Sequence, residues 1–320
     1  MDWFERLTGF RELPWEETRA RLEVLGDRLH SRVNGRSYGI GRLEVASVAE
    51  LRVRALGAPK GSLRLSKLTG DVRAMHADPA NQGALFQVAS QFNLLEMIGP
   101  EVTPEDGVSR YAGDHTQGPA CAVAAGAATI FRNYFAPVNG QSGQTATRQI
   151  DALADLGAAL GNQGEQLWRM RNGYALCTRE GLDEIAARLS SASAAEIDAL
   201  RDLLRIGLHW DVEVTDAHHE PRPVVSQAFC SALPVAYTGI PARHWRPFAR
   251  LVLEGAYEAT LWAAALNAAR GASNIVYLTR LGGGAFGNDA EWIDAAMQRA
   301  LALARDVALD VRVVSFGKGR

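Results

Sequence analysis

The chain has 320 residues, 47% of them hydrophobic, which is ample for a sizeable core. Its 34 basic and 36 acidic side chains leave a net charge of -2 without any block of like charges, so the composition excludes nucleic acid and anionic membrane surfaces as expected partners. The three cysteines, Cys121, Cys177 and Cys230, lie far apart and form no CxxC pair, which predicts free thiols in a cytoplasmic protein.

Residues 1–60 are predicted to form a helical and hairpin extension that packs on a main domain of residues 61–320. The first residues, MDWFERLTGF, lack a secretory-signal pattern, and no apolar run in the chain reaches the ~18–20 residues of a membrane span. Two helical patterns follow, the second from Trp15 to Leu29, and Asn34-Gly35 marks a turn between strands. A helix is expected to start at Ser47.

Residues 62–72 predict a strand that ends at Gly70-Asp71. Residues 81–97, NQGALFQVASQFNLLEM, carry apolar residues at helical spacing and predict a helix. Residues 100–118 form a long polar loop, of a kind that a compact domain seldom keeps without a function. A helix rich in small residues is expected after it.

The last hundred residues alternate strand, helix, strand, loop, helix and strand, the last strand spanning residues 309–316. Strands are also expected at 172–178 and 208–215, with one or two helices across 179–205. This order is typical of a parallel or mixed sheet covered by helices, so we expect one elaborated α/β domain.

A glycine-rich turn joins the buried strand at 275–279 to the helix that follows, and it contains Gly282, Gly283, Gly284 and Gly287. Backbone N–H groups that converge at a helix N-terminus bind anions. The spacing fits neither GxGxxG nor the P-loop. It favours a phosphate cradle with Phe286 stacked on a sugar or base, although a tight turn with Phe286 in the core remains an alternative.

Asp106 and Asp114 lie eight residues apart in the polar loop, where two carboxylates can converge on one reacting centre. The alternative is structural: Asp106 starts a turn and Asp114 caps the next helix. Asp71 can close a turn or accept a hydrogen bond from the amino group of a base. The histidines lack the spacing of metal ligands, so no metal site is expected.

Several segments together resemble a known family, and the resemblance extends over roughly residues 30–317. GDV at 70–72 and GGGAFGND at 282–289 resemble the adenine-contacting and phosphate-binding segments of macrodomains and poly(ADP-ribose) glycohydrolases. The set NGRSYGIGRLE, ASQFNLLEM, PEDGVSRY, DHTQGPACA, FCSALPVAY and YEATLWAA is more closely similar to the divergent macrodomain-like group of the MavL type, whose members remove ADP-ribose from arginine side chains.

The resemblance implies a macrodomain-like mixed sheet and an ADP-ribosyl-arginine hydrolase that needs no cofactor. Its partner would be an ADP-ribosylated protein, with a ubiquitin-like protein as one candidate, or ADP-ribose itself. A reader that binds ADP-ribose or a related nucleotide metabolite without cleaving it is the alternative, because a reader needs the glycine loop but not the acids.

Carried over by position, Asp106 and Asp114 correspond to the catalytic acids of that group. The resemblance further implies a set of substrate-binding residues: Asp71, Gln91, Asn93, Glu96, Gln117, Gly282, Gly283, Gly284, Phe286 and Gly287. A third acid expected shortly after Asp114 is missing between His115 and Ile150. Either Glu96 or Asp71 takes that role, or the activity is weaker or different.

Overall fold

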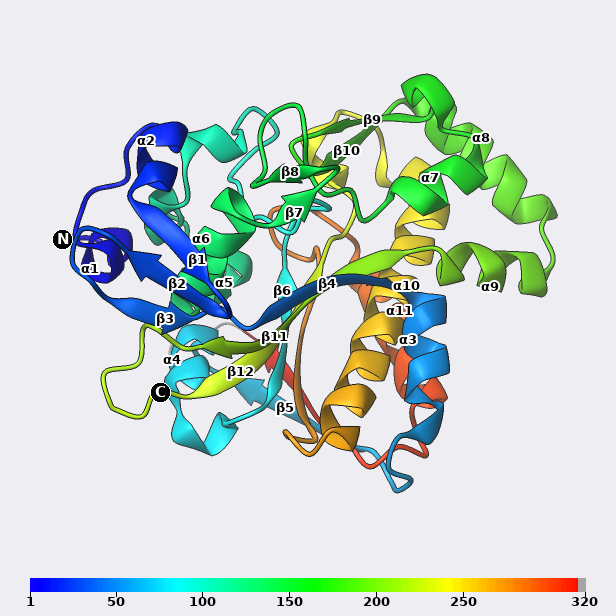
Figure 1. Cartoon of the computed structure of the whole chain (residues 1–320). Helices are drawn as coiled ribbons and strands as arrows, with labels where there is room; N and C mark the ends of the chain where they lie inside the picture. The colour runs from blue at the N-terminus through cyan, green and yellow to red at the C-terminus, as the bar shows by residue number, and fades with distance from the viewer. Residues whose placement is uncertain (316–320) are drawn as a thin grey trace.

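A seven-stranded mixed sheet forms the centre of the computed structural model, which describes residues 1–315 (Figure 1). Residues 316–320 lie outside the described residues. They include Phe316, the end of the predicted last strand, and the end of the predicted main domain. The strands follow the order β4 (Arg42–Ser47), β11 (Arg205–Glu213), β12 (Val224–Cys230), β6 (Leu85–Ala89), β13 (Ile275–Thr279), β14 (Asp310–Ser315) and β5 (Arg64–Thr69). Strand β11 pairs antiparallel with both β4 and β12, and the five strands from β12 to β5 run parallel.

Helices cover both faces of this sheet, which confirms the predicted α/β class with a mixed sheet (Figure 1). The long helix α10 packs against the short helix α3 and three others on one face, and α5 packs against β6 beside α4 and α6 on the other. The helices are α1 (Trp3–Thr8), α2 (Trp15–Ala20), α3 (Val48–Arg54), α4 (Val72–Ala77), α5 (Gln117–Ala124), α6 (Gly126–Tyr134), α7 (Ala154–Leu160), α8 (Arg179–Ser191), α9 (Ala194–Asp202), α10 (Ala242–Ala269) and α11 (Ala290–Leu303).

Strand β6 corrects the prediction of a helix over residues 81–97. Leu85 packs into the core on the α10 face, whereas Phe86 and Val88 pack into the core on the α4 and α5 face. Gln87 points toward α10 and donates a hydrogen bond to Thr260 at 2.9 Å. A strand buried on both faces has no polar alternation, so its apolar run can be mistaken for a helix.

The N-terminal segment is less helical than its sequence pattern suggests. The predicted helix from Trp15 to Leu29 ends at Ala20, and a small antiparallel sheet of β1 (Leu22–Leu25), β2 (Arg28–Ser31) and β3 (Ser37–Gly39) follows. Helix α3 begins directly after Ser47, in agreement with the predicted start, and Ser47 caps it in a capping box with Glu50. Because β4 is the edge strand of the central sheet, the chain crosses into the main fold before residue 60. The division at residue 60 stays a prediction.

Two short hairpins complete the structure. One joins β7 (Pro137–Val138) to β8 (Gln141–Ser142), and the other joins β9 (Trp168–Arg171) to β10 (Tyr174–Cys177). Asn172 and Gly173 turn the second hairpin with positive φ angles of 47° and 79°, a conformation that Asn-Gly pairs favour. This turn brings Tyr174 to the wall of a cavity that is described below.

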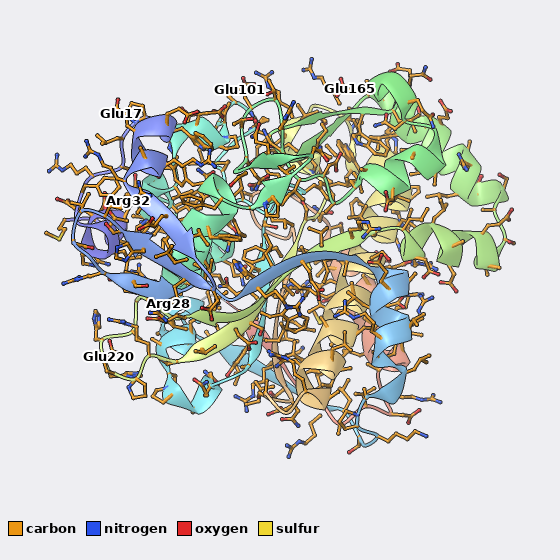
Figure 2. The ribbon with its side chains drawn as sticks, in the orientation of Figure 1. Glu17, Arg28, Arg32, Glu101, Glu165 and Glu220 are labelled. Carbon is orange, nitrogen blue, oxygen red and sulfur yellow. The ribbon has the colours of Figure 1, made fainter. Side chains whose placement is uncertain are left out.

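Charged side chains lie around the outside of the molecule, as the labelled residues in Figure 2 illustrate. Within residues 1–315 no helix has the length and apolar character that crossing a membrane requires. All three cysteines are buried and unpaired, as predicted.

Candidate functional site

A cavity of about 430 Å³ opens where the parallel strands β12, β6 and β13 end. Ala89, the last residue of β6, and Thr279, the last residue of β13, both line it, and Ala232 lies just after β12. Ligands of open α/β sheets bind at the carboxyl ends of the strands, because the loops that leave neighbouring strands diverge there. The position and size of the cavity are therefore those of a small-molecule site.

The glycine loop forms one wall of the cavity and presents free backbone donors. Gly287 donates to the Gly284 carbonyl at 3.0 Å, which closes the loop, and Asn288 donates to the Gly282 carbonyl at 2.9 Å. Within residues 1–315 the N–H groups of Gly284, Ala285 and Phe286 have no hydrogen-bond acceptor, and all three residues line the cavity. Three consecutive free donors near the start of α11 suit an anion.

The glycines of this loop serve two different purposes. Gly282 and Gly287 have φ angles of 73° and 71°. A Cβ on Gly282 would lie 2.5 Å from the Cβ of Ala232, so the fold itself requires this glycine. A Cβ on Gly284 would meet nothing within 4 Å, so here the missing side chain only leaves the backbone open to the cavity. Gly283 and Gly287 support the loop without lining the cavity.

Three aromatic rings form a second wall. The Phe286 ring centroid lies 5.3 Å from that of Tyr174 and 5.5 Å from that of Tyr237. Tyr174 donates its hydroxyl to the Met97 carbonyl at 2.6 Å, and burial raises its pKa further above the ordinary value, so it stays neutral. Phe286 is half-buried at this wall and also packs against the main core, while its stacking on a sugar or base stays a prediction.

The tyrosines were missed by sequence reasoning. Tyr174 lies directly after the Asn172-Gly173 turn, and Tyr237 follows the long apolar run that begins at β12. The turn and the buried strand are visible in the sequence, but only the packing of the hairpin against the glycine loop shows that the two rings share one wall.

Two carboxylates reach the cavity, Asp114 from the polar loop and Glu96 from the segment after β6. Asp114 is half-buried and accepts a hydrogen bond from the Thr116 N–H at 2.8 Å. Glu96 is 2% exposed, and burial raises its pKa to about 7 although the Arg132 guanidinium favours its ionised form. Both acids, with Ile98, also line an adjoining hollow of about 280 Å³.

Arg132 holds Glu96 in place from a fully buried position. Its Nη2 lies 3.4 and 3.5 Å from the two carboxylate oxygens of Glu96, and its Nε donates to the Leu94 carbonyl at 3.1 Å. The guanidinium carbon lies 3.9 Å from the ring centroid of Phe229. Because these separations to Glu96 are long for an ion pair, the arginine fixes the carboxylate without fully offsetting its burial.

Gln91 and Gln117 also line the cavity, and each uses its amide to fix the backbone there. Gln91 accepts a hydrogen bond from the Met97 N–H at 2.8 Å. Gln117 accepts one from the Ala89 N–H and donates one to the Gln87 carbonyl, both at 2.8 Å, and so docks α5 onto the end of β6.

Besides Gly283 and Gly287, three predicted site residues lie outside the cavity lining. Asp106 accepts hydrogen bonds from the N–H and hydroxyl of Thr103 at 2.8 and 3.1 Å within a short 3-10 turn. Asp71 is exposed and caps α4 through the Arg73 N–H at 2.8 Å. Asn93 is fully buried and donates to Gln149 at 2.8 Å. The structure thus brings together Gln91, Glu96, Asp114, Gln117, Gly282, Gly284 and Phe286 from the predicted set.

Comparison with solved structures finds neighbours of low sequence identity. The chain is similar to the poly(ADP-ribose) glycohydrolase of Deinococcus radiodurans in complex with ADP-ribose, with 11% identity, a TM-score of 0.46, and 86% of this chain and 87% of that chain covered. It is also similar to the Thermomonospora curvata enzyme, with 15% identity, a TM-score of 0.46, and 90% and 86% covered. No family model and no curated protein matches the chain. Likeness at this level of identity and TM-score does not by itself assign an activity.

Proposed function

We propose that this chain is a hydrolase of the MavL-type group that releases ADP-ribose from arginine side chains of proteins. The observation that carries the proposal is the convergence, in one cavity, of three free backbone donors, an aromatic wall and two carboxylates of different environment. Each of these suits a different part of an ADP-ribosyl group.

The glycine loop supplies the binding half of the site. The free N–H groups of Gly284, Ala285 and Phe286 would receive the diphosphate, and the nearby N-terminus of α11 adds partial positive charge. The Phe286 ring would then lie against the ribose next to the diphosphate. Binding energy collected here orients the distal ribose toward the acids.

The two acids supply the chemical half. Cleavage of the bond between ribose C1″ and the guanidinium nitrogen builds positive charge on the sugar ring, which the Asp114 carboxylate would stabilise. The bonding electrons leave with the arginine as a neutral guanidine. Water adds at C1″ and gives its proton to ionised Glu96, which passes the proton on to the guanidine. The pKa of about 7 lets Glu96 accept and release this proton near neutrality.

Glu96 is the acid that shares the cavity with Asp114, so it is our choice for the role of the missing third acid. The catalytic assignment of Asp106 stays a prediction from the sequence resemblance, since its carboxylate is bonded within its own turn. The rate at which an Asp106→Asn variant releases ADP-ribose distinguishes a catalytic role from a turn-capping one.

A reader of ADP-ribose would use the same loop and aromatic wall. A buried carboxylate with a raised pKa is costly to keep and gives a pure reader no advantage, which favours the hydrolase.

The test is to measure ADP-ribose binding by calorimetry and, with the same preparation, single-turnover release of ADP-ribose from Arg-, Glu- and Ser-linked proteins. We expect binding together with release from the arginine-linked protein. Binding without release from any linkage would establish the reader instead.

A further inference from the structure

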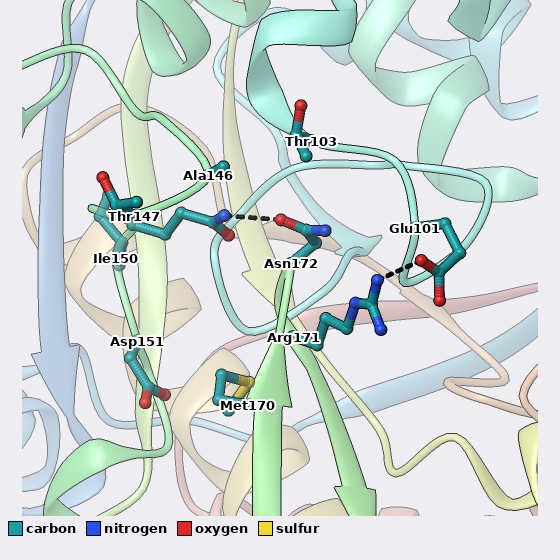
Figure 3. Close-up of a pocket in the computed structure, with 10 residues that line it drawn as sticks. Glu101, Thr103, Ala146, Thr147, Ile150, Asp151, Met170, Arg171 and Asn172 are labelled. Carbon is teal, nitrogen blue, oxygen red and sulfur yellow. Dashed lines mark hydrogen bonds and ion pairs between the residues drawn. The ribbon is translucent and has the colours of Figure 1, made fainter.

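A second cavity of about 430 Å³ shares no lining residue with the first. It lies between the segment that holds Glu101 and Thr103, the loop that runs from Ala146 to Asp151, and the turn of the β9–β10 hairpin (Figure 3). The Glu101 side chain is 71% exposed and reaches the outline of the molecule in Figure 2, so the cavity meets solvent at this end.

Most polar groups of this cavity already have partners. Arg171 forms an ion pair with Glu101, and Gln149 donates to Asn172 at 2.8 Å (Figure 3). Asn172 in turn donates to the Pro100 carbonyl at 2.7 Å. These bonds fix the shape of the cavity and leave its arginine neutralised.

Asp151 is the exception. Its Oδ1 accepts a hydrogen bond from the Leu153 N–H at 2.8 Å, but within residues 1–315 it forms no ion pair. Burial raises its pKa, the Leu153 N–H opposes that change, and the negative charge of Asp155 adds to it. A carboxylate that is desolvated without a cation is destabilised, and a cation brought from outside would offset this cost.

The walls beside Asp151 are aliphatic. Met170 and Ile150 line the same cavity as Asp151 (Figure 3). An apolar stem that ends in a positive charge matches this arrangement, and lysine and arginine are the side chains with that construction.

We propose that this cavity binds a basic side chain, arginine or lysine, of a polypeptide partner. The cationic ligand follows from Asp151 and its walls alone, whereas the choice of a polypeptide rests on the proposed function. Arg171 of this cavity is the cross-strand neighbour of Tyr174, which lines the first cavity. A target protein whose modified arginine enters the first cavity would therefore bring a neighbouring segment to the second, and we expect a basic residue in that segment.

Fluorescence polarisation of labelled peptides tests the proposal with the full chain. One peptide carries a single arginine between glycines and serines, a second carries lysine there, and a third carries glutamine. We expect the wild type to bind the two basic peptides roughly tenfold more tightly than the glutamine peptide, as one charge-assisted hydrogen bond allows. Affinity should rise with pH as Asp151, whose pKa is raised by burial, loses its proton, because the proton and the peptide compete for the carboxylate.

Asp151→Asn should abolish this preference, and it keeps the Oδ1 that bonds Leu153, so the start of α7 is retained. Asp27→Asn removes the same charge from an exposed turn and should keep the preference. Ala146→Trp, at the exposed edge of the cavity, should block binding while Asp151 stays in place.

A wild type without preference, or an Asp151→Asn variant that keeps it, overturns the proposal. If arginine amide competes as strongly as the peptide, the polypeptide part is wrong. The peptides carry no ADP-ribose, so these results stand apart from the hydrolase assay, and ADP-ribose affinity of the Asp151→Asn variant should equal that of the wild type.

Discussion

The surroundings of Glu96 shift its pKa into the range that the proposed proton transfer requires. Burial opposes its charge, while Arg132 at 3.4 Å favours that charge, and the balance leaves the pKa at about 7. Asp114 lines the same cavity but is only half-buried, with one backbone donor. Two carboxylates in unlike environments can divide the work, one stabilising positive charge and the other moving a proton.

Asp114→Asn should lower single-turnover release of ADP-ribose by about 100-fold or more, while ADP-ribose affinity changes little. Asparagine keeps the oxygen that accepts from Thr116, so the loop should fold. Product carries no guanidinium and so gains little from the carboxylate. Release assays run beside a binding titration check this, and an Asp114→Asn protein that cleaves as fast as the wild type would exclude the catalytic role.

Glu96→Gln should change how stability depends on pH. The pKa of Glu96 lies near 7 in the folded chain against an ordinary 4.5, so the folded state holds the proton more tightly. In the wild type, the free energy of unfolding that this proton adds is fully present below about pH 4.5 and is lost as the pH rises through about 7.

Glutamine does not titrate, so the free energy of unfolding of the variant, relative to the wild type, should rise by on the order of 2 kcal/mol between pH 5 and pH 8. Urea unfolding of both proteins at the two pH values measures this. An equal change in the free energy of unfolding of both proteins between the two pH values would show that Glu96 has an ordinary pKa.

At the level of the element, we expect two glycines of the loop to have different roles: Gly284 in ligand binding and Gly282 in folding. Gly284→Val should weaken ADP-ribose binding at least tenfold, because the side chain would occupy space that the free N–H groups face, and a loss of one charge-assisted hydrogen bond is of this size. The fold should be unaffected, since the position is open. Gly282→Ala is the contrast: its Cβ would meet Ala232 at 2.5 Å, so it should lower stability. Calorimetry and thermal unfolding of both variants separate the two effects, and equal stability losses would contradict the assignment.

The sequence predicted this loop, its strand and its helix because a buried run, four glycines and the Asp289 cap are local signals. It did not predict β6, because a strand buried on both faces carries no alternation that distinguishes it from a helix. Nor could spacing place Asp106 relative to the cavity: in its 3-10 turn the carboxylate bonds Thr103, whereas Asp114 reaches the lining eight residues later. The shared wall of Tyr174 and Tyr237 depends on distant segments that meet only in the fold.

For the whole molecule, a site built at the ends of three strands ties ligand binding to global stability. The cavity draws its walls from segments as far apart as Ala89 and Phe286, so a ligand that fills it contacts much of the folded chain. By mass action, ADP-ribose at 100 times its Kd should raise the free energy of unfolding by about 2.7 kcal/mol if it binds only the folded chain. Thermal unfolding with ADP-ribose, ATP and NAD measures this; a larger effect of ATP or NAD would count against the proposed ligand.

The pairing of β5 with β14 has a consequence for biosynthesis. Arg64 lies opposite Asp310 and Thr69 opposite Ser315, so a growing polypeptide must be extended by more than two hundred residues before β5 meets its partner. Until then β5 is a strand without its sheet partner, the kind of segment that can pair with a wrong strand. Arg64 and Lys67 are exposed and charged, and charges on a strand disfavour pairing with a wrong strand. We therefore expect these two residues to reduce aggregation of the nascent chain.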